Sequence, residues 1–115
     1  MKHINANIAR NICEHAVMRR GVFHEHAKWF ASALVETSLM GIDTHGLRLL
    51  PLYLRELDEG RSNPAPAFKT LRQRGGMAAI DADSALGTVA GMHAARTAAR
   101  LARQYGIGAV AIGSV

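Results

Sequence analysis

Apolar residues recur at helical spacing in the first part of the chain. Ile4, Ile8 and Ile12 lie four residues apart, which places them along one side of a helix. Two arginines and then Gly21 follow, and basic residues and glycine are typical of the last turn and the end of a helix. This pattern predicts a first helix over residues 4–20.

A second helix is predicted over residues 24–40 by the strongest pattern in the chain, and Gly41 ends it. Its apolar positions repeat at spacings of three and four, as one buried stripe on a helix requires. The stripe consists of Ala27, Phe30, Ala31, Leu34 and Val35, and Ser38 occupies the next position of the same repeat.

A polar elbow at residues 41–46 leads into a third predicted helix. The apolar positions of this helix are Leu47, Leu50, Leu54 and Leu57. Proline is compatible with a helix only in the first turn, so Pro51 constrains where the helix begins. Two starts are open: one near Leu49, and one at Asp43 or Thr44 with a kink at Pro51.

The second half of the chain follows a proline-containing connector at residues 63–66, which cannot continue a helix. Two short segments, residues 68–72 and 77–81, then flank Gly75-Gly76. Short segments on either side of two glycines are typical of a β-hairpin.

The last predicted elements are a helix over residues 86–105 and a continuously apolar strand over residues 107–113. Gly87 and Gly91 lack the three-glycine phosphate fingerprint, and their spacing indicates a helix packing contact instead. Small residues gather on one side of the helix, and we expect this side to approach a sheet. They are Thr88, Met92, Ala95, Ala99 and Ala102.

These elements predict an α/β fold of the α+β type. A helical N-terminal domain covers residues 1–62, and residues 63–115 form the incomplete start of a mixed α/β domain. A continuously apolar strand is typical of a buried position in a sheet. One hairpin and one helix do not cover such a strand on both sides, so the chain is predicted to be the front portion of a larger fold or one part of an oligomer.

Composition and charge narrow the classes of function. With 49% hydrophobic and 20% charged residues the chain is not intrinsically disordered, and no apolar run is long enough to span a membrane. The polar N-terminus lacks the apolar stretch of a signal peptide, and the single cysteine cannot form an internal disulfide, so we expect a cytoplasmic protein. The net charge is +5, but the basic residues are dispersed and only 5% of residues are aromatic, which disfavours nucleic-acid binding.

His45 is the strongest candidate for chemistry. It lies in the polar elbow, between Thr44 and Gly46 and shortly before Arg48. A histidine donates protons near neutral pH, and an arginine can bind a carboxylate through two hydrogen bonds. In the alternative interpretation, Asp43 or Thr44 caps the third helix and His45 only lies beside the cap. The spacing leaves both interpretations open.

The other histidines and Cys13 carry weaker signals. His24 and His26 are two positions apart, so on a helix they point in different directions and do not share one metal ion. His15 and His93 have no acidic or cysteine partners at ligand spacing, and no metal site is predicted. Cys13 is expected to be a small buried residue rather than a nucleophile.

The stretch from Glu36 to Tyr53 resembles the signature of the type-2 malate/L-lactate dehydrogenases. This family includes ureidoglycolate dehydrogenase, diketogulonate reductase and cyclic-imino-acid reductases. The shared pattern is a helix, a glycine, Thr-His-Gly at residues 44–46, an arginine, and a tyrosine eight residues after the histidine. Further segments resemble the family in the same order, at residues 60–66, 80–87 and 105–112.

The resemblance implies an oxidoreductase, dependent on NAD or NADP, that interconverts 2-oxo acids and 2-hydroxy acids. It also implies a non-Rossmann fold and a homodimer. By resemblance, His45 donates the proton to the carbonyl oxygen during reduction, Arg48 holds the substrate carboxylate, and Thr44 and Tyr53 line the pocket. The implied substrates extend over lactate, malate, ureidoglycolate and imino acids.

Two features depart from the family. Many members place the arginine one residue further from the histidine than Arg48 is, and members are much longer than 115 residues. The resemblance therefore implies an N-terminal portion that lacks most cofactor-binding segments and does not catalyse turnover alone. The alternatives are a catalytically inactive truncated homologue that acts as a dimerisation module, and a small basic DNA-binding protein.

Overall fold

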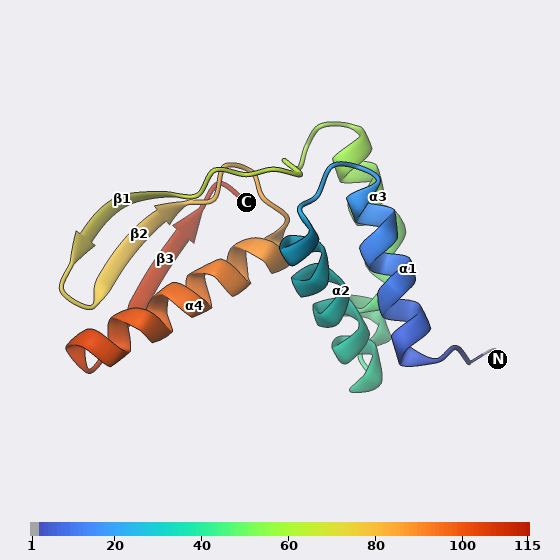
Figure 1. Ribbon diagram of the computed structural model, residues 1–115, viewed down its shortest axis with the longest axis horizontal. Helices are drawn as coiled ribbons and strands as arrows, with labels where there is room; N and C mark the ends of the chain where they lie inside the picture. Colours follow the sequence, from blue (N-terminus) through green and yellow to red (C-terminus); the bar gives the residue numbers. More distant parts are fainter. Residues whose placement is uncertain (1–2) are drawn as a thin grey trace. The chain divides into compact units, whose positions relative to one another are not determined.

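The computed structural model describes residues 3–115, which form two compact units (Figure 1). The first unit ends at Ala65 and the second begins at Pro66, so the division lies inside the proline-containing connector. The first unit is helical, and the second contains a three-stranded sheet and one helix. Helices and a small mixed sheet are the elements of the predicted α/β class. None of the helices in residues 3–115 combines the length and the apolar character that a membrane crossing requires.

Helix α1 (Ala6–Met18) begins where the side chain of Asn5 accepts a hydrogen bond from the Asn7 amide at 2.8 Å. The helix packs against α2 and buries Ala9, Cys13 and Val17. The isoleucine spacing predicted this helix, but the isoleucines do not form its buried side: Ile4, Ile8 and Ile12 are each more than half exposed. Smaller side chains occupy the contact because they let two helix axes approach closely.

Helix α2 (His24–Leu39) forms the centre of the helical unit, and the predicted stripe is confirmed. All five apolar members of the stripe are buried, and Leu34 is only 1% exposed. An ion pair between Arg20 and Asp58, 2.8 Å from Nε to Oδ1, connects the end of α1 to α3 (Leu50–Asp58). The prediction that Cys13 is a buried apolar residue is also confirmed, since it is 1% exposed.

The start of α3 settles how the elbow is built. Two short 3-10 turns, Asp43–His45 and Leu47–Leu49, precede the helix, and Pro51 lies in its first turn. The start near Leu49 is therefore confirmed, and the continuous helix with a kink at Pro51 is wrong. No side chain caps α3, so the interpretation of Asp43 or Thr44 as its cap is also wrong.

His26 lies in a ring cluster at the start of α2. Its imidazole lies 5.5 Å from the Phe23 ring and 5.2 Å from the Trp29 ring, measured between centroids. Burial lowers the pKa of His26 below its ordinary value of 6.5, and the nearby Glu25 opposes this shift. The folded protein thus binds a proton at this position more weakly than the unfolded chain does.

This difference in pKa predicts acid sensitivity. The contribution of His26 to stability is complete above about pH 6.5 and is lost as the pH falls below that value, because the unfolded chain takes up the proton first. Replacing His26 with Phe is expected to flatten the fall in the free energy of unfolding between pH 7.5 and 5, measured by urea denaturation. The exposed His24, replaced with Gln, is the control. Equal pH dependence in wild type and H26F would contradict the prediction.

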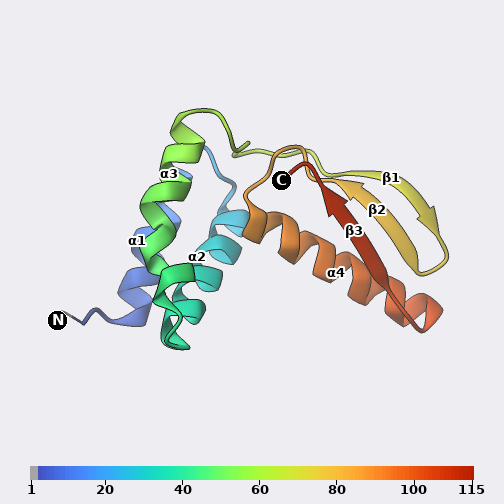
Figure 2. The same cartoon turned by 180° about the vertical axis from the view of Figure 1, so that it is seen from behind.

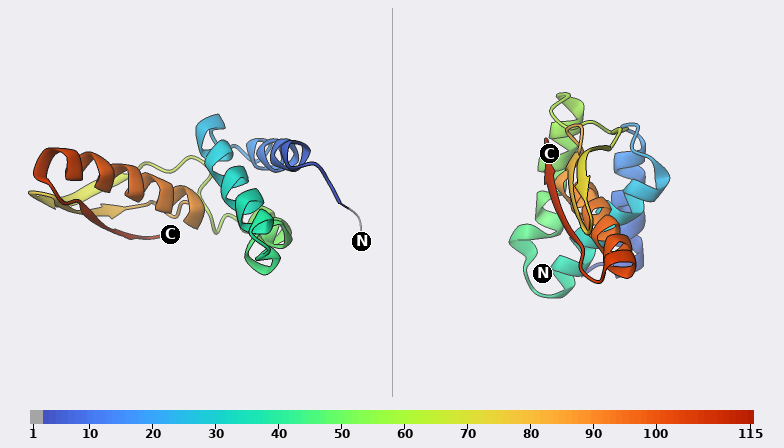
Figure 3. Two further views of the ribbon diagram at one scale, coloured as in Figure 1. Left: turned by 90° about the horizontal axis from the view of Figure 1, so that it is seen from below. Right: turned by 90° about the vertical axis from the view of Figure 1, so that its left-hand side faces the viewer.

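The second unit contains a sheet of strand order β1-β2-β3 (Figure 2). Strands β1 (Lys69–Arg74) and β2 (Met77–Asp81) are antiparallel and joined at Gly75-Gly76, which confirms the predicted hairpin. Strand β3 (Ala109–Gly113) pairs with β2 in parallel. Helix α4 (Gly87–Tyr105) connects β2 to β3 and lies along one face of the sheet (Figure 3).

The buried side of α4 differs from the predicted small-residue side. The helix buries Val89, Ala90, Ala94 and Leu101, whereas Ala95 and Ala99 are exposed. The larger side chains fill the space above the sheet, and the alanine side is left to solvent. Close backbone approach occurs elsewhere, at Gly108, where a Cβ atom would collide with the carbonyl of Ala98 on α4. The predicted packing contact at Gly87 and Gly91 is wrong for residues 3–115, because no heavy atom beyond the helix's own backbone lies within 4 Å of a Cβ built at either position.

Strand β3 is an edge strand and is not buried. Its residues alternate between exposed and half-buried, so the described residues do not cover this apolar strand on both sides, as the sequence predicted. The half-buried positions, Val110 and Ile112, pair with Ala78 and Ile80 of the adjacent strand. Ile112 and Phe68 pack against a core cluster of small residues, which are Ala82, Ala85 and Ala90.

Candidate functional site

The candidate site is the elbow between α2 and α3. The hydroxyl of Ser38, in the last turn of α2, donates a hydrogen bond to Oδ1 of Asp43 at 2.9 Å. Oγ of Ser38 also accepts a hydrogen bond from the backbone N–H of Leu47 at 2.8 Å. These two partners lie on either side of His45. The elbow is therefore attached to α2 both before and after the histidine.

Two glycines allow the elbow to turn and to lie against α2. Gly41 has a φ of +83°, a conformation that residues with a Cβ adopt rarely. Gly46 is buried, and a Cβ built on it would lie 2.8 Å from the backbone nitrogen of Ser38 and 3.0 Å from the carbonyl oxygen of Leu34. Only glycine fits this close approach of the two backbones.

His45 itself is exposed and is oriented by its neighbour. Its Nδ1 lies 3.1 Å from the hydroxyl oxygen of Thr44, which is hydrogen-bonding distance. The hydroxyl can accept from Nδ1–H in both the charged ring and the neutral ring whose hydrogen is on Nδ1. Nε2 is then the nitrogen left to give or take a proton. This geometry suits general acid–base chemistry.

Within the described residues, the side chains of Arg48 and Tyr53 form no hydrogen bond with His45. Arg48 is exposed in the second 3-10 turn and forms no hydrogen bond or ion pair with any of residues 3–115. Tyr53 packs edge-on against Phe30, with ring centroids 5.4 Å apart and planes at 87°. Burial and the charge of Glu56 raise the pKa of Tyr53, so its hydroxyl is protonated at neutral pH.

Ser38 is the site residue whose role the sequence did not reveal. Its hydrophobic-stripe position indicated only that it faces the core. Its hydrogen bonds reach Asp43 and Leu47, which are five and nine residues further along the chain. These spacings do not belong to a helical or strand repeat, so no sequence pattern indicates them. The polar character of one position in an otherwise apolar stripe was the available signal.

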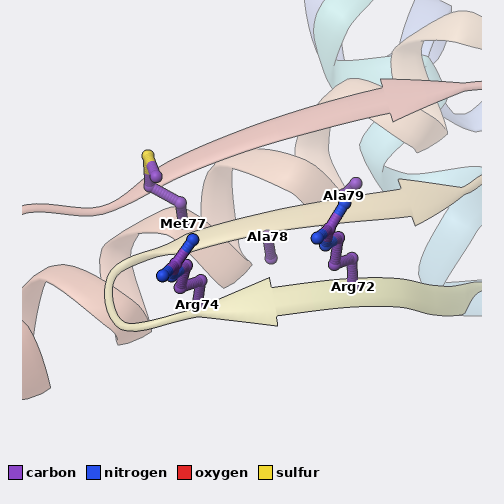
Figure 4. Close-up of a pocket in the computed structure, with 5 residues that line it drawn as sticks. All are labelled: Arg72, Arg74, Met77, Ala78 and Ala79. Atoms are coloured by element: carbon purple, nitrogen blue, oxygen red, sulfur yellow. The ribbon is translucent and has the colours of Figure 1, made fainter.

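Two of the hollows formed by residues 3–115 are relevant to ligand binding. One adjoins the elbow in the first unit, where Val35, Ser38 and Leu47 form part of its lining together with residues from the N-terminal segment. The other lies on the sheet of the second unit, where Arg72 and Arg74 of β1 extend beside Met77 and Ala79 of β2 (Figure 4). Across residues 3–115, no three His, Cys, Asp or Glu side chains are grouped so that they could hold a metal ion.

Fold and site together define a protein with a helical unit that presents an exposed histidine on an anchored elbow. Comparison with known proteins identifies the family to which the chain belongs. The family model described as malate/L-lactate dehydrogenase matches residues 4–115, and the chain belongs to this family. The resemblance seen in the sequence is thereby confirmed.

Individual relatives agree with the family assignment. The chain is 37% identical over 91 residues to L-sulfolactate dehydrogenase of Methanocaldococcus jannaschii, covering 79% of this chain and 26% of that protein. It is 35% identical over 98 residues to hydroxycarboxylate dehydrogenase B of Escherichia coli K12, covering 84% and 27%. The structure of malate dehydrogenase from Pyrococcus horikoshii matches with a TM-score of 0.92 at 29% identity, covering 95% of this chain and 31% of that chain.

The chain thus spans roughly a quarter to a third of the length of these relatives, and it corresponds to their N-terminal portion. By name these relatives are dehydrogenases of hydroxy acids, and a further relative is 2,3-diketo-L-gulonate reductase of Klebsiella pneumoniae, at 28% identity. The match therefore establishes an oxidoreductase family for this chain.

Proposed function

We propose that this chain is the N-terminal part of an NAD(P)-dependent oxidoreductase that interconverts 2-oxo acids and 2-hydroxy acids. The observation that carries the proposal is the anchored elbow with His45 at its exposed point, in a chain that matches the family over residues 4–115. The names of the relatives supply the substrate class, since sulfolactate and malate are both 2-hydroxy acids.

In this proposal His45 is the general acid and base. During reduction of a 2-oxo acid its Nε2 gives a proton to the oxygen that develops negative charge, and in the reverse direction it takes the proton back. Thr44 supports this transfer, because Nδ1–H donates to its hydroxyl whether or not Nε2 carries a proton. The exposed guanidinium of Arg48 binds the substrate carboxylate, and Tyr53 contributes a protonated hydroxyl to the pocket wall.

The nicotinamide cofactor does not fit the residues of this chain alone. A dinucleotide needs a surface for its pyrophosphate, commonly a glycine-rich turn at a helix N-terminus. The N-terminus of α4 has no such three-glycine turn, and the hollow beside the elbow is lined mainly by apolar residues. We therefore assign no cofactor contact to residues 3–115 and propose that the remaining part of the family fold binds NAD or NADP.

The proposal predicts that the 115-residue chain does not turn over substrate alone. Hydride transfer requires the nicotinamide ring held about 3–3.5 Å from the substrate carbon, and none of residues 3–115 is assigned to hold it. We expect no saturable change in NADH or NADPH fluorescence when the purified chain is added, and no oxidation of either with a panel of 2-oxo acids. Binding with measurable reduction of any acid would show that the site is complete without further sequence.

A second candidate function is that of an inactive homologue acting as a dimerisation module. The observation that favours it is the set of exposed isoleucines on α1 and just before it, namely Ile8 and Ile12 on the helix and Ile4 ahead of it. Sedimentation of wild type and of the Ile8→Lys variant tests whether this side forms a dimer. A dimer that I8K dissociates supports association through α1, and loss of turnover on replacing His45 in a complete enzyme then separates the oxidoreductase from the inactive module.

A further inference from the structure

We infer that Ser38 is a positioning residue for His45, acting through a hydroxyl that fixes both sides of the elbow to helix α2. The inference rests on the proposed role of His45, and it adds to that role the residue that determines where the imidazole lies. Ser38 is half-buried in the last turn of α2, and no part of the proposed chemistry uses it directly.

The two hydrogen bonds of the Ser38 hydroxyl have only one possible direction. The Leu47 N–H is solely a donor, so it donates to Oγ of Ser38 at 2.8 Å. The hydroxyl hydrogen is then free to be donated to the carboxylate of Asp43 at 2.9 Å. A single side chain thus satisfies one donor and one acceptor that belong to the two sides of the elbow.

The bond to Leu47 replaces a missing cap. Leu47 is the first residue of the second 3-10 turn, and the N–H groups at the start of such a turn have no partner within it. A side chain at the preceding position normally caps such a turn by accepting from its second or third N–H, but that position is Gly46. Glycine is required there by the close approach to α2, so the cap comes from Ser38 of the neighbouring helix.

The backbone between these two anchors is also held by hydrogen bonds. The His45 N–H donates to the carbonyl of Ile42 at 3.1 Å, and the Gly46 N–H donates to the carbonyl of Asp43 at 3.1 Å. The position of the His45 backbone therefore depends on Asp43 and Leu47, and both of these depend on Ser38. Thr44 then sets the ring through its contact with Nδ1.

The experiment compares Ser38→Ala with a matched control, Thr37→Val, in the full 115-residue chain. Thr37 is the preceding residue of α2 and is also half-buried, and its hydroxyl donates only to the carbonyl of Ala33 within the helix at 2.7 Å. Both substitutions remove one hydroxyl from the same turn, but only S38A releases the elbow. Ser38→Thr, which keeps a hydroxyl, tests for rescue.

Two NMR measurements report the result. In S38A the Leu47 amide is expected to exchange with solvent faster by about fivefold to tenfold, as the loss of one hydrogen bond implies. The ring ¹⁵N shifts of His45, which report the balance of its two tautomers, are expected to move in S38A, to stay unchanged in T37V, and to return toward wild type in S38T.

Unchanged His45 ring shifts in a folded S38A chain would overturn the inference, as would equal changes in S38A and T37V. If S38A does not fold, Asp43→Ala removes only one of the two anchors, and the same shift in the His45 ring is expected. These measurements need no turnover, so they test the placement of His45 separately from its proposed chemistry. Failure of that chemistry appears instead as retained kcat when His45 is replaced.

Discussion

Replacing His45 with Gln is expected to lower kcat by about 10²–10⁴-fold in a complete enzyme, because general acid–base catalysis typically contributes that much. The complete enzyme is a chimera in which residues 4–115 replace the matching N-terminal segment of the Pyrococcus horikoshii malate dehydrogenase. That protein has the same fold over 95% of this chain. The rate to measure is malate-dependent reduction of the nicotinamide cofactor under saturating conditions.

The affinity of the chimera for the cofactor is expected to remain nearly unchanged, since no residue of this chain is assigned to cofactor binding. A matched control is His15→Gln. His15 is also exposed, but it lies on α1 and its ring nitrogen contacts only the carbonyl of Asn11, at 2.7 Å. If H45Q retains the kcat of the unmodified chimera, His45 is not the proton donor, and the proposed role of the elbow fails.

Replacing Leu34 with Ala is expected to destabilise the helical unit by about 2–5 kcal/mol, the range observed when large core side chains are truncated. Leu34 is 1% exposed on the side of α2 that packs into the core. Its carbonyl also lies beside Gly46, so the loss of packing occurs directly beneath the elbow. Urea denaturation monitored by circular dichroism gives the free energy of unfolding.

Leu39→Ala provides the control for this measurement. Leu39 is the last residue of the same helix and is 66% exposed, so its truncation removes little buried surface. We expect a change within about 0.5 kcal/mol for L39A, as is usual for surface substitutions. A cost for L34A as small as that of L39A would place the stripe on the surface and contradict the assignment of the core.

Local patterns were sufficient for the elements that depend on neighbouring residues. The stripe from Ala27 to Val35 and the hairpin at Gly75-Gly76 were predicted correctly. Each reflects a constraint that acts within a few residues: helical periodicity in the first case and the φ demands of a tight turn in the second. Pro51 narrowed the start of α3 to two places for the same reason.

Patterns failed where two surfaces of one element were both apolar or small. In α1 the isoleucines suggested one side, yet Ala9 and Val17 lie in the core. In α4 the small residues predicted that their side of the helix faces the sheet, yet Val89 and Leu101 on a different side lie in the core. A periodic pattern gives the element but not which of two similar sides faces its neighbour, because that depends on the volume available between them.

The sequence by itself determined the order and type of the elements, the family, and His45 as the candidate acid–base residue. It could do so because a glycine, a histidine and an arginine within one elbow are a local pattern. Only the tertiary structure decided what holds that elbow, because the Ser38 hydroxyl bonds Asp43 and Leu47 across a turn between separate elements. Hydrogen bonds of this kind depend on how close two backbone segments lie in space, and the spacing of residues along the chain does not predict that closeness.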